Sequence, residues 1–257
     1  MDKIFRVALA GDTFHVAVRD GELRRIDGDI FGRYTVGDLI TRGLPVAGLR
    51  VLAPVTPSKI VCVGLNYKDH AGEVGKALPA EPLIFIKPTS AVIGPGDPIM
   101  IPPGVGRVDH EAELGIVIGR RAHRVARANA WDYVLGLTCV NDVTARDLQK
   151  KESQYTRCKG FDTFAPIGPC VATGLNGEPR SVQCWVNGER RQTSSTKHLI
   201  FPIEMLIEFV TFVMTLEPGD IISTGTPEGI GPIKDGDSVR VVVEGVGELV
   251  NPVRNES

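Results

Sequence analysis

The amino-acid sequence predicts a β-rich α+β fold with short helices, and two observations carry this prediction. Twenty-nine glycines and 18 prolines recur along the 257 residues, a distribution typical of many turns rather than of a helical bundle. Several of the short runs between them are continuously apolar, as expected for buried strands. A hydrophobic fraction of 42% and a charged fraction of 23% are ordinary for a globular protein with a sizeable core.

The first segment is predicted to be a small β unit. Two strand-like runs, residues 5–10 and 13–18, are joined by a tight turn at Gly11. Two prolines, Pro54 and Pro57, then interrupt regular structure. We therefore expect a small N-terminal β domain over residues 1–56 and a larger domain over residues 57–257.

The larger domain is expected to begin with a buried strand over residues 60–64, which are continuously apolar until a final glycine. A short helix is predicted to follow over residues 66–73. A longer helix is predicted over residues 202–214, where apolar side chains recur at helical spacing and Pro202 suits the first turn. The C-terminal region alternates and carries turn glycines, which predicts a closing hairpin.

The strongest local pattern lies between His110 and Gly119. In a strand, alternate positions place Glu111 and Glu113 on one face, and the intervening positions are wholly apolar. Like charges this close raise one another's pKa unless a cation lies between them. Glycines on the carboxylate face are expected to leave room for a ligand. The alternative is a solvated strand face, since charged residues are usually exposed.

A third carboxylate, Asp142, directly follows the apolar run of residues 134–140, and strand ends commonly carry functional side chains. Three hard oxygen ligands without a histidine or cysteine cluster suit Mg²⁺ or Mn²⁺. The sequence therefore predicts a metal site at Glu111, Glu113 and Asp142, with open positions for water and substrate. Asp142 could equally cap a helix predicted over residues 143–149.

A second cluster is Tyr67, His70 and Glu73, which would form one stripe along the short helix. Glu73 can orient or charge-stabilise His70, which makes His70 a candidate general base near neutral pH. A surface helix with an incidental ion pair is the alternative.

Four further positions are candidates for holding a substrate. Arg146 and Gln149 share one face of their predicted helix. Lys159 precedes a glycine-containing turn and could hold a carboxylate or polarise a carbonyl. The glycine-rich stretch around Thr226 could offer backbone amides and a hydroxyl to an anion. That stretch lacks the lysine of a phosphate-binding loop, and no G-x-S-x-G elbow is present, so nucleotide and serine-hydrolase functions are disfavoured.

Composition disfavours several other classes. A net charge of -2 offers no basic patch for nucleic acid or an anionic membrane. Five scattered cysteines, none in a C-x-x-C arrangement, argue against a disulfide framework or a zinc site. No apolar run approaches the roughly 20 residues needed to span a bilayer, and no secretory signal is recognisable. We expect a cytoplasmic protein.

Six ordered motifs, from about Ile60 to the C-terminus, closely resemble the fumarylacetoacetate hydrolase family. They are Asn66-Tyr67-x-x-His70-x-x-Glu73, Phe85-Ile86-Lys87-Pro88, Asp109-His110-Glu111-Ala112-Glu113-Leu114, Asn141-Asp142-Val143-Thr144-Ala145-Arg146-Asp147-Leu148-Gln149, Lys159-Gly160-Phe161-Asp162-Thr163-Phe164 and Thr224-Gly225-Thr226-Pro227. The N-terminal segment looks like the short accessory domain of bacterial members.

The resemblance implies a mixed β-sandwich or β-roll core, a homodimer, and one Mg²⁺ or Mn²⁺ per subunit. It places the metal on Glu111, Glu113 and Asp142, and it makes His70 and Glu73 a catalytic dyad on a lid that orders when substrate binds. Lys159 joins them as a catalytic residue. The remaining matches are positions that hold the substrate: Tyr67, Arg146, Gln149, Gly225 and Thr226.

The expected function is metal-dependent chemistry on a small 2-oxo acid through a metal-bound enolate. C–C bond hydrolysis of an acylpyruvate or a fumarylacetoacetate-like substrate comes first. The runner-up is isomerisation or decarboxylation of hydroxymuconate-type diacids from aromatic degradation, such as 2-hydroxyhepta-2,4-diene-1,7-dioate, or decarboxylation of oxaloacetate. A non-catalytic protein that binds 2-oxo acids is a third alternative, and no nucleic-acid or membrane partner is expected.

Overall fold

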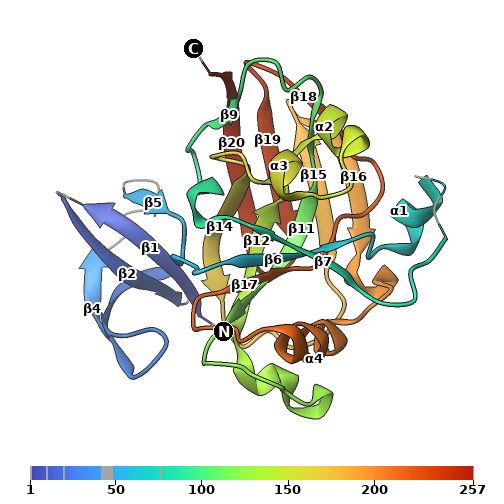
Figure 1. The fold of residues 1–257 in the computed structure, drawn as a ribbon. Coiled ribbons are helices and arrows are strands. Elements are labelled where there is room, and N and C mark those ends of the chain that lie inside the picture. Colours follow the sequence, from blue (N-terminus) through green and yellow to red (C-terminus); the bar gives the residue numbers. More distant parts are fainter. Residues whose placement is uncertain are drawn as a thin grey trace.

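The computed structural model describes residues 2–9, 11–19, 21–41, 49–73, 75 and 77–256. It confirms the β-rich fold with few short helices (Figure 1). The largest sheet has twelve strands, ten of them in the order β4-β3-β2-β1-β14-β12-β11-β17-β6-β7. Their bounds are β4 Tyr34–Thr41, β3 Glu22–Gly28, β2 Asp12–Arg19, β1 Lys3–Leu9, β14 Ala165–Ala172, β12 Val134–Asn141, β11 Ala112–Ile118, β17 Ile221–Ser223, β6 Ile60–Gly64 and β7 Leu83–Lys87, with β5 Arg50–Leu52 pairing β1 and β8 Val92–Ile93 pairing β14.

Two smaller sheets and seven short helical segments complete the described structure. The five-stranded sheet consists of β16 Glu189–Ser195, β15 Ser181–Val186, β19 Ser238–Val243, β20 Gly247–Asn255 and β9 Ile99–Ile101; the three-stranded sheet consists of β13 Thr144–Ala145, β10 Val108–His110 and β18 Gly231–Ile233. The α-helices are α1 Lys68–Glu73, α2 Arg146–Lys151, α3 Thr156–Lys159 and α4 Ile203–Val213; η2 Thr89–Ala91, η3 Arg127–Tyr133 and η4 Thr196–His198 are 3₁₀ segments. None of the described helices has the length and apolarity needed to cross a membrane.

The N-terminal strands continue the main sheet on one side of the molecule (Figure 1). The predicted hairpin is confirmed, because β1 and β2 are antiparallel with Leu9 opposite Asp12. Gly11 has a φ of +96°, which favours glycine, and Ala10 lies outside the described residues. Strand β1 also pairs with β14 through Lys3 and Ala172. The segment predicted as a separate N-terminal domain therefore shares a sheet with the larger part of the chain.

The centre of the main sheet is buried on both faces. Leu114, Ile116 and Ile118 of β11 belong to a core formed with the five-stranded sheet, whereas Val117 belongs to a second core on the opposite face. This confirms the apolar face predicted for this strand. It also explains why β11 reads as an almost continuous apolar run, since both of its faces pack against other elements.

The glycines near the carboxylates do not have the role predicted for them. A Cβ at Gly115 would lie 2.6 Å from Val140 Cγ2 and 2.9 Å from Thr138 Cγ2. A Cβ at Gly119 would lie 3.0 Å from the Leu135 nitrogen. The space that they leave is filled by the neighbouring strand β12, so the prediction that these glycines leave room for a ligand was wrong.

The helices differ from the prediction at their beginnings. Helix α4 lies within the predicted range, with Pro202 just before it. Helix α1 begins only at Lys68, because the Asn66 side chain is used elsewhere: its Oδ1 accepts from the Phe201 amide and its Nδ2 donates to Thr224 O at 2.7 Å. Tyr67 forms an isolated bridge with Leu199 and shares no helical stripe with the residues that follow.

Helix α2 begins at Arg146, three residues later than predicted, because Thr144 and Ala145 pair with β10 as strand β13. Ala145 occupies the position before the first turn of α2. Asp142 therefore does not cap this helix, and its carboxylate is left for contacts with the side chains described next.

Candidate active site

A cavity of about 450 Å³ brings together most of the predicted site residues. Its wall is formed by Val63, Gly64, Leu65, His70, Phe85, Glu111, Glu113, Asp142, Arg146, Gln149, Lys150, Tyr155, Lys159, Thr226 and Ile230. A neighbouring cavity of about 500 Å³ has no carboxylate, histidine or lysine in its wall. Of these two cavities, the first therefore has the groups for acid–base or metal chemistry.

The three predicted metal ligands meet at one end of the cavity because β11 and β12 are paired. Ala112 lies opposite Asn141, so the residues flanking this pair are neighbours. The Asp142 amide donates to Glu111 O at 2.8 Å, and the Glu111 amide donates to the Asn141 side chain at 3.0 Å. One carboxylate oxygen each from Glu111, Glu113 and Asp142 lies within 4.8 Å of the others, and all three residues are buried.

Two buried lysines face these carboxylates. Lys159 Nζ donates to Glu111 Oε2 at 2.8 Å and to Asp142 Oδ2. Lys87 Nζ donates to Asp142 Oδ1 at 2.5 Å and to Val143 O at 3.0 Å. Buried charges require such pairing, since an unpaired one carries a large desolvation cost. Lys87 belongs to a motif of the family resemblance, but no role was predicted for it. The one signal for it in the sequence is a lysine at the end of an apolar run.

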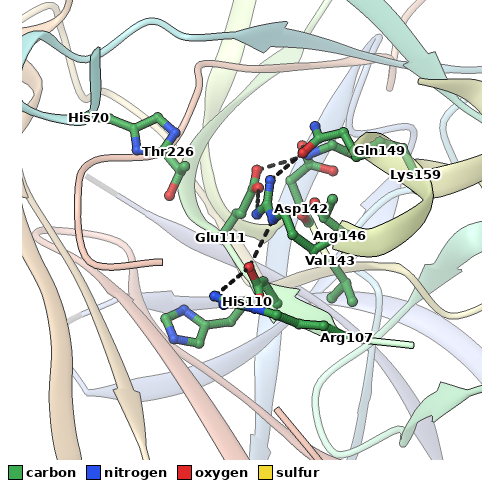
Figure 2. A network of polar contacts seen from close by, with 12 residues as sticks. His70, Arg107, His110, Glu111, Asp142, Val143, Arg146, Gln149, Lys159 and Thr226 are labelled. Carbon is green, nitrogen blue, oxygen red and sulfur yellow. Dashed lines mark hydrogen bonds and ion pairs between the residues drawn. The ribbon is translucent and has the colours of Figure 1, made fainter. Parts of the chain in front are cut away.

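Arg146 holds the other side of the carboxylate cluster (Figure 2). It donates to Glu111 Oε1 and to Gln149 Oε1, and its Nε donates to Asp109 Oδ2 at 2.8 Å. Asp109 also accepts from Arg107 Nε at 2.6 Å. The predicted shared face of Arg146 and Gln149 is confirmed by their contact. The role of Asp109 as the carboxylate that orients Arg146 was not predicted.

Of the three carboxyl groups, that of Glu113 has its charge least balanced by the neighbouring cations. Burial raises the pKa of Glu113 to about 8, and the charges of Asp142 and Glu111 add to the effect. Burial also opposes ionisation of Glu111, but Lys159 and Arg146 outweigh it and hold the pKa of Glu111 well below its usual range. Burial lowers the pKa of Lys159, yet Asp142 and Glu111 outweigh this and raise it, so Lys159 is a cation and not a base.

This donor set fits a divalent cation of the hard type. Its ligand atoms are carboxylate oxygens, the kind that Mg²⁺ and Mn²⁺ prefer. Glu113 is held by the Ser223 hydroxyl at 2.5 Å and the Gly225 amide at 2.8 Å, both on Oε2. A cation beside Glu113 would remove the like-charge repulsion that raises its pKa.

The histidine–glutamate pair lies on α1, away from the carboxylates. His70 Nδ1 is 2.8 Å from Glu73 Oε2, so Nδ1 carries the hydrogen; in the neutral imidazole Nε2 is then the acceptor. Glu73 Oε1 accepts from the Gly229 amide at 3.0 Å. Asp69 Oδ2 accepts from the Ser194 hydroxyl at 2.7 Å, which attaches α1 to β16.

Figure 2 shows His70 and Thr226 on one side of the cavity and Glu111, Arg146 and Lys159 on the other. Thr226 and Gly225 were predicted to offer donors to an anion, but the structure gives both groups other partners. The Gly225 amide donates to Glu113, and the Thr226 hydroxyl donates to Ala112 O at 3.0 Å.

Three predicted site residues are not part of the cavity wall: Tyr67, Glu73 and Gly225. Tyr67 is fully buried, and within the described residues its hydroxyl has no hydrogen-bond partner. Gly225 has a φ of +95°, and a Cβ there would lie 2.8 Å from the Asn66 Cβ, so the position requires glycine. Direct substrate contact by Tyr67 and Gly225 stays a prediction.

The chain combines a β-rich fold, three buried carboxylates and a histidine–glutamate pair. This combination is typical of the fumarylacetoacetate hydrolases. The family model described as "Fumarylacetoacetate (FAA) hydrolase C-terminal" matches residues 59–254. The chain therefore belongs to the fumarylacetoacetate hydrolase family, whose similar solved members include an isomerase and a hydrolase.

Several known proteins are similar along most of the chain. The 2-hydroxyhepta-2,4-diene-1,7-dioate isomerase of Mycobacterium marinum is 39% identical, with a TM-score of 0.91 and 100% of both chains covered. The maleylpyruvate hydrolase of Sphingobium sp. SYK-6, solved with manganese(II) and pyruvate, is 30% identical, with a TM-score of 0.81, covering 99% of this chain and 100% of that one. The mitochondrial oxaloacetate tautomerase of Xenopus laevis is 41% identical over 220 residues, which are 80% of this chain and 69% of the relative.

Proposed function

We propose that the protein hydrolyses a C–C bond of an acylpyruvate or a fumarylacetoacetate-like 2-oxo acid, with Mg²⁺ or Mn²⁺ bound by Glu111, Glu113 and Asp142. One observation carries this proposal: His70, whose Nδ1 is paired with Glu73, belongs to the wall of the same cavity as the three carboxylates. A bound divalent cation would supply positive charge that stabilises the enolate developing on the substrate.

His70 acts as the general base in this reaction. Glu73 fixes the hydrogen on Nδ1 and stabilises the imidazolium that forms when Nε2 takes a proton from water. The resulting hydroxide equivalent attacks the distal carbonyl carbon of the substrate. After the C–C bond breaks, His70 returns the proton to the departing carbon, so that an acid and a 2-oxo acid are formed.

Lys159 and Arg146 stabilise negative charge on the opposite side of the cavity. The ammonium group of Lys159 lies between Glu111 and Asp142 and keeps its proton, because these carboxylates raise its pKa. It can donate a hydrogen bond to a substrate oxygen bound beside the carboxylates. Arg146 is fixed by Asp109 and Glu111, which sets its orientation before substrate binds.

Isomerisation or decarboxylation is the second candidate, favoured by the similar proteins whose names describe an isomerase and a tautomerase. Both reactions use the same stabilised enolate and a proton carrier, but neither needs an attacking water. His70 would then move a proton between substrate atoms. The residues around the carboxylates serve all of these reactions equally well.

The test is turnover of acetylpyruvate, oxaloacetate and 2-hydroxyhepta-2,4-diene-1,7-dioate by metal-stripped protein, before and after addition of Mg²⁺ or Mn²⁺. Product NMR separates the reactions: hydrolysis gives two acids, decarboxylation releases CO₂, and isomerisation conserves mass. Metal-restored release of acetate and pyruvate is the expected result. Absence of turnover on every substrate, with tight oxalate binding retained, would instead support a non-catalytic binding protein.

A further inference from the structure

The second cavity, of about 500 Å³, adjoins the candidate active site. Two aromatic residues, Phe85 and Tyr155, belong to the walls of both cavities. Their ring centroids are 5.3 Å apart in an edge-to-face arrangement. Lys159 belongs to the wall of the first cavity, and the next residue, Gly160, belongs to the wall of the second. The two cavities therefore meet at this pair of rings.

The wall of the second cavity is mostly apolar and carries no charge. No described residue of this wall is acidic or basic. Besides the two rings, its side chains are those of Ile84, Ile86, Pro88, Met214, Gln154 and Thr156. A carboxylate placed there would lose water without gaining a cation, whereas an apolar group would lose little. The cavity therefore favours an uncharged ligand group.

Part of this wall is exposed apolar surface contributed by distant segments. Ile86 lies on β7, the edge strand of the main sheet, and keeps 42% of its surface exposed. Met214 directly follows α4. Exposed apolar surface in a hollow of this size is typical of a binding site for a small molecule.

The charged cluster of the first cavity lies close to the shared rings. Lys159 Nζ is 5.1 Å from the centre of the Phe85 ring, and it is paired with Glu111 and Asp142. A 2-oxo acid held beside these carboxylates would need only a few further carbon atoms to contact Phe85. A longer chain would then reach the apolar wall.

We propose that the second cavity is the acyl subsite, and that the protein prefers acylpyruvates whose acyl group is an uncharged chain of several carbons. This inference rests on the proposed hydrolysis. The 2-oxo acid part stays beside Lys159, and the acyl chain follows the rings of Phe85 and Tyr155 into the second cavity. Ile86 and Met214 contact the distal carbons, so they determine specificity and take no part in the chemistry.

The first test compares substrates on Mn²⁺-loaded protein. Hexanoylpyruvate is longer than acetylpyruvate by four methylene groups, and each buried methylene contributes up to about four-fold. We expect kcat/KM for hexanoylpyruvate to be at least about ten-fold higher. In 2,4-dioxononanedioate a carboxylate replaces the terminal methyl of hexanoylpyruvate, and this advantage should be lost.

Two substitutions in different segments test the wall. Ile86→Asp and Met214→Gln should each lower the ratio of kcat/KM for hexanoylpyruvate to that for acetylpyruvate, by about ten-fold for aspartate and by less for glutamine. Val250→Asp is the matched control, because Val250 on β20 keeps 38% of its surface exposed and belongs to neither cavity wall. Its ratio should equal that of the wild-type protein. Thermal melting identifies any variant that is misfolded.

A binding measurement separates this inference from the proposed hydrolysis. 2-Oxononanoate has the chain length of hexanoylpyruvate but lacks the 4-carbonyl group that water attacks, so it binds without being hydrolysed. Calorimetry on Mn²⁺-loaded protein should show tighter binding of 2-oxononanoate than of 2-oxopentanoate, and Ile86→Asp should reduce the difference.

Equal kcat/KM for both acylpyruvates, or an unchanged ratio in both folded variants, would overturn the acyl subsite and leave the proposed hydrolysis in place. An unchanged ratio with dissociation of a dimer in Ile86→Asp, seen by gel filtration, would assign this wall to a contact between subunits instead. Tighter binding of 2-oxononanoate by wild-type protein that hydrolyses neither acylpyruvate would overturn the proposed hydrolysis but support the second cavity as an apolar subsite.

Discussion

The two sides of the cavity are held in different ways. The pairing of β11 with β12 sets the positions of the Glu111 and Asp142 carboxylates. Their ion-pair partners, Lys87 and Lys159, are buried with them. The opposite side is carried by α1, a helix of six residues. Described side-chain contacts tie α1 to the loop at Gly229 and to β16.

Because the two sides are held differently, we expect substitutions on each side to affect folding and turnover differently. Charges buried beside Glu111 must remain neutralised, so a change there affects folding as well as chemistry. The Glu73 side chain keeps 32% of its surface exposed. No described ion pair joins His70 or Glu73 to the three carboxylates, so a change at either should affect turnover more than the folded structure. The predictions below test this division, beginning with the largest effect.

Replacing His70 by alanine should lower kcat by roughly 10²- to 10⁴-fold, the usual contribution of a general base. Because His70 contacts none of the three carboxylates directly, we expect Mn²⁺ affinity and the melting temperature to stay unchanged. Steady-state kinetics, calorimetric Mn²⁺ titration and thermal melting measure the three quantities. Full activity in this variant would show that His70 is not the base, and lost Mn²⁺ binding would show that the two sides are not independent.

Replacing Asp142 by asparagine should affect folding and ion binding together. Lys87 and Lys159 would each lose a buried ion-pair partner, and breaking a buried pair costs about 3–5 kcal/mol. Urea unfolding of metal-stripped protein measures this cost, and Mn²⁺ titration measures the loss of a ligand. Asp132→Asn, a change at an exposed position, is the control. Wild-type stability in Asp142→Asn would contradict the view that this side depends on charge neutralisation.

Glu113 should make the stability of the metal-free protein depend on pH. Its pKa is raised from 4.5 to about 8, so between these values the folded state holds a proton that the unfolded state has released. The free energy of unfolding should therefore fall as pH rises from 4.5 to 8, by about 1.4 kcal/mol per unit at most.

Glu113→Gln should lack this fall, and the difference between the two urea-unfolding profiles isolates the contribution of Glu113. Ion binding at pH 7 should release a proton from wild-type protein, which calorimetry in buffers of different ionisation enthalpy detects. Parallel profiles for the two proteins would contradict the raised pKa.

Ser194→Ala should give the smallest effect, on the α1 side only. It removes the hydroxyl that binds Asp69, and one hydrogen bond contributes about 1 kcal/mol. Amide hydrogen exchange in α1 should then become roughly five-fold faster, with global stability unchanged. The matched control is Ser195→Ala on the same strand, whose hydroxyl accepts from the Lys197 amide instead. Equal acceleration in both variants would show that β16 does not hold α1 through Asp69.

Much of the carboxylate side could be predicted, because it follows from local patterns. Strand alternation placed Glu111 and Glu113 together, and the end of an apolar run added Asp142. The predicted role of the nearby glycines, leaving room for a ligand, was wrong. Strand alternation tells which face a residue occupies but not what packs against that face. Gly115 meets Val140 and Thr138 of the neighbouring strand.

Contacts between distant segments could not be predicted. Gln192 on β16 and Thr226 in the loop between β17 and β18 are 34 residues apart in sequence, so no local pattern connects them. The same holds for Ser194 and Asp69, which are 125 residues apart. Lys87 shows the intermediate case: its motif was recognised, but its partner Asp142 lies 55 residues away. Pairing of this kind becomes visible only when the register of the sheets is known.

Through its two carboxylate oxygens, Glu73 couples the orientation of His70 to the attachment of α1 at Gly229. One oxygen orients His70, and the other accepts from the Gly229 amide that holds α1 down. A long substrate that kept α1 away from Gly229 would break the hydrogen bond between the Gly229 amide and Glu73. Glu73 would then orient the His70 imidazole less well. Such a molecule could bind and yet react slowly. For such a molecule, the Glu73–Gly229 contact rather than the cavity volume would limit the reaction.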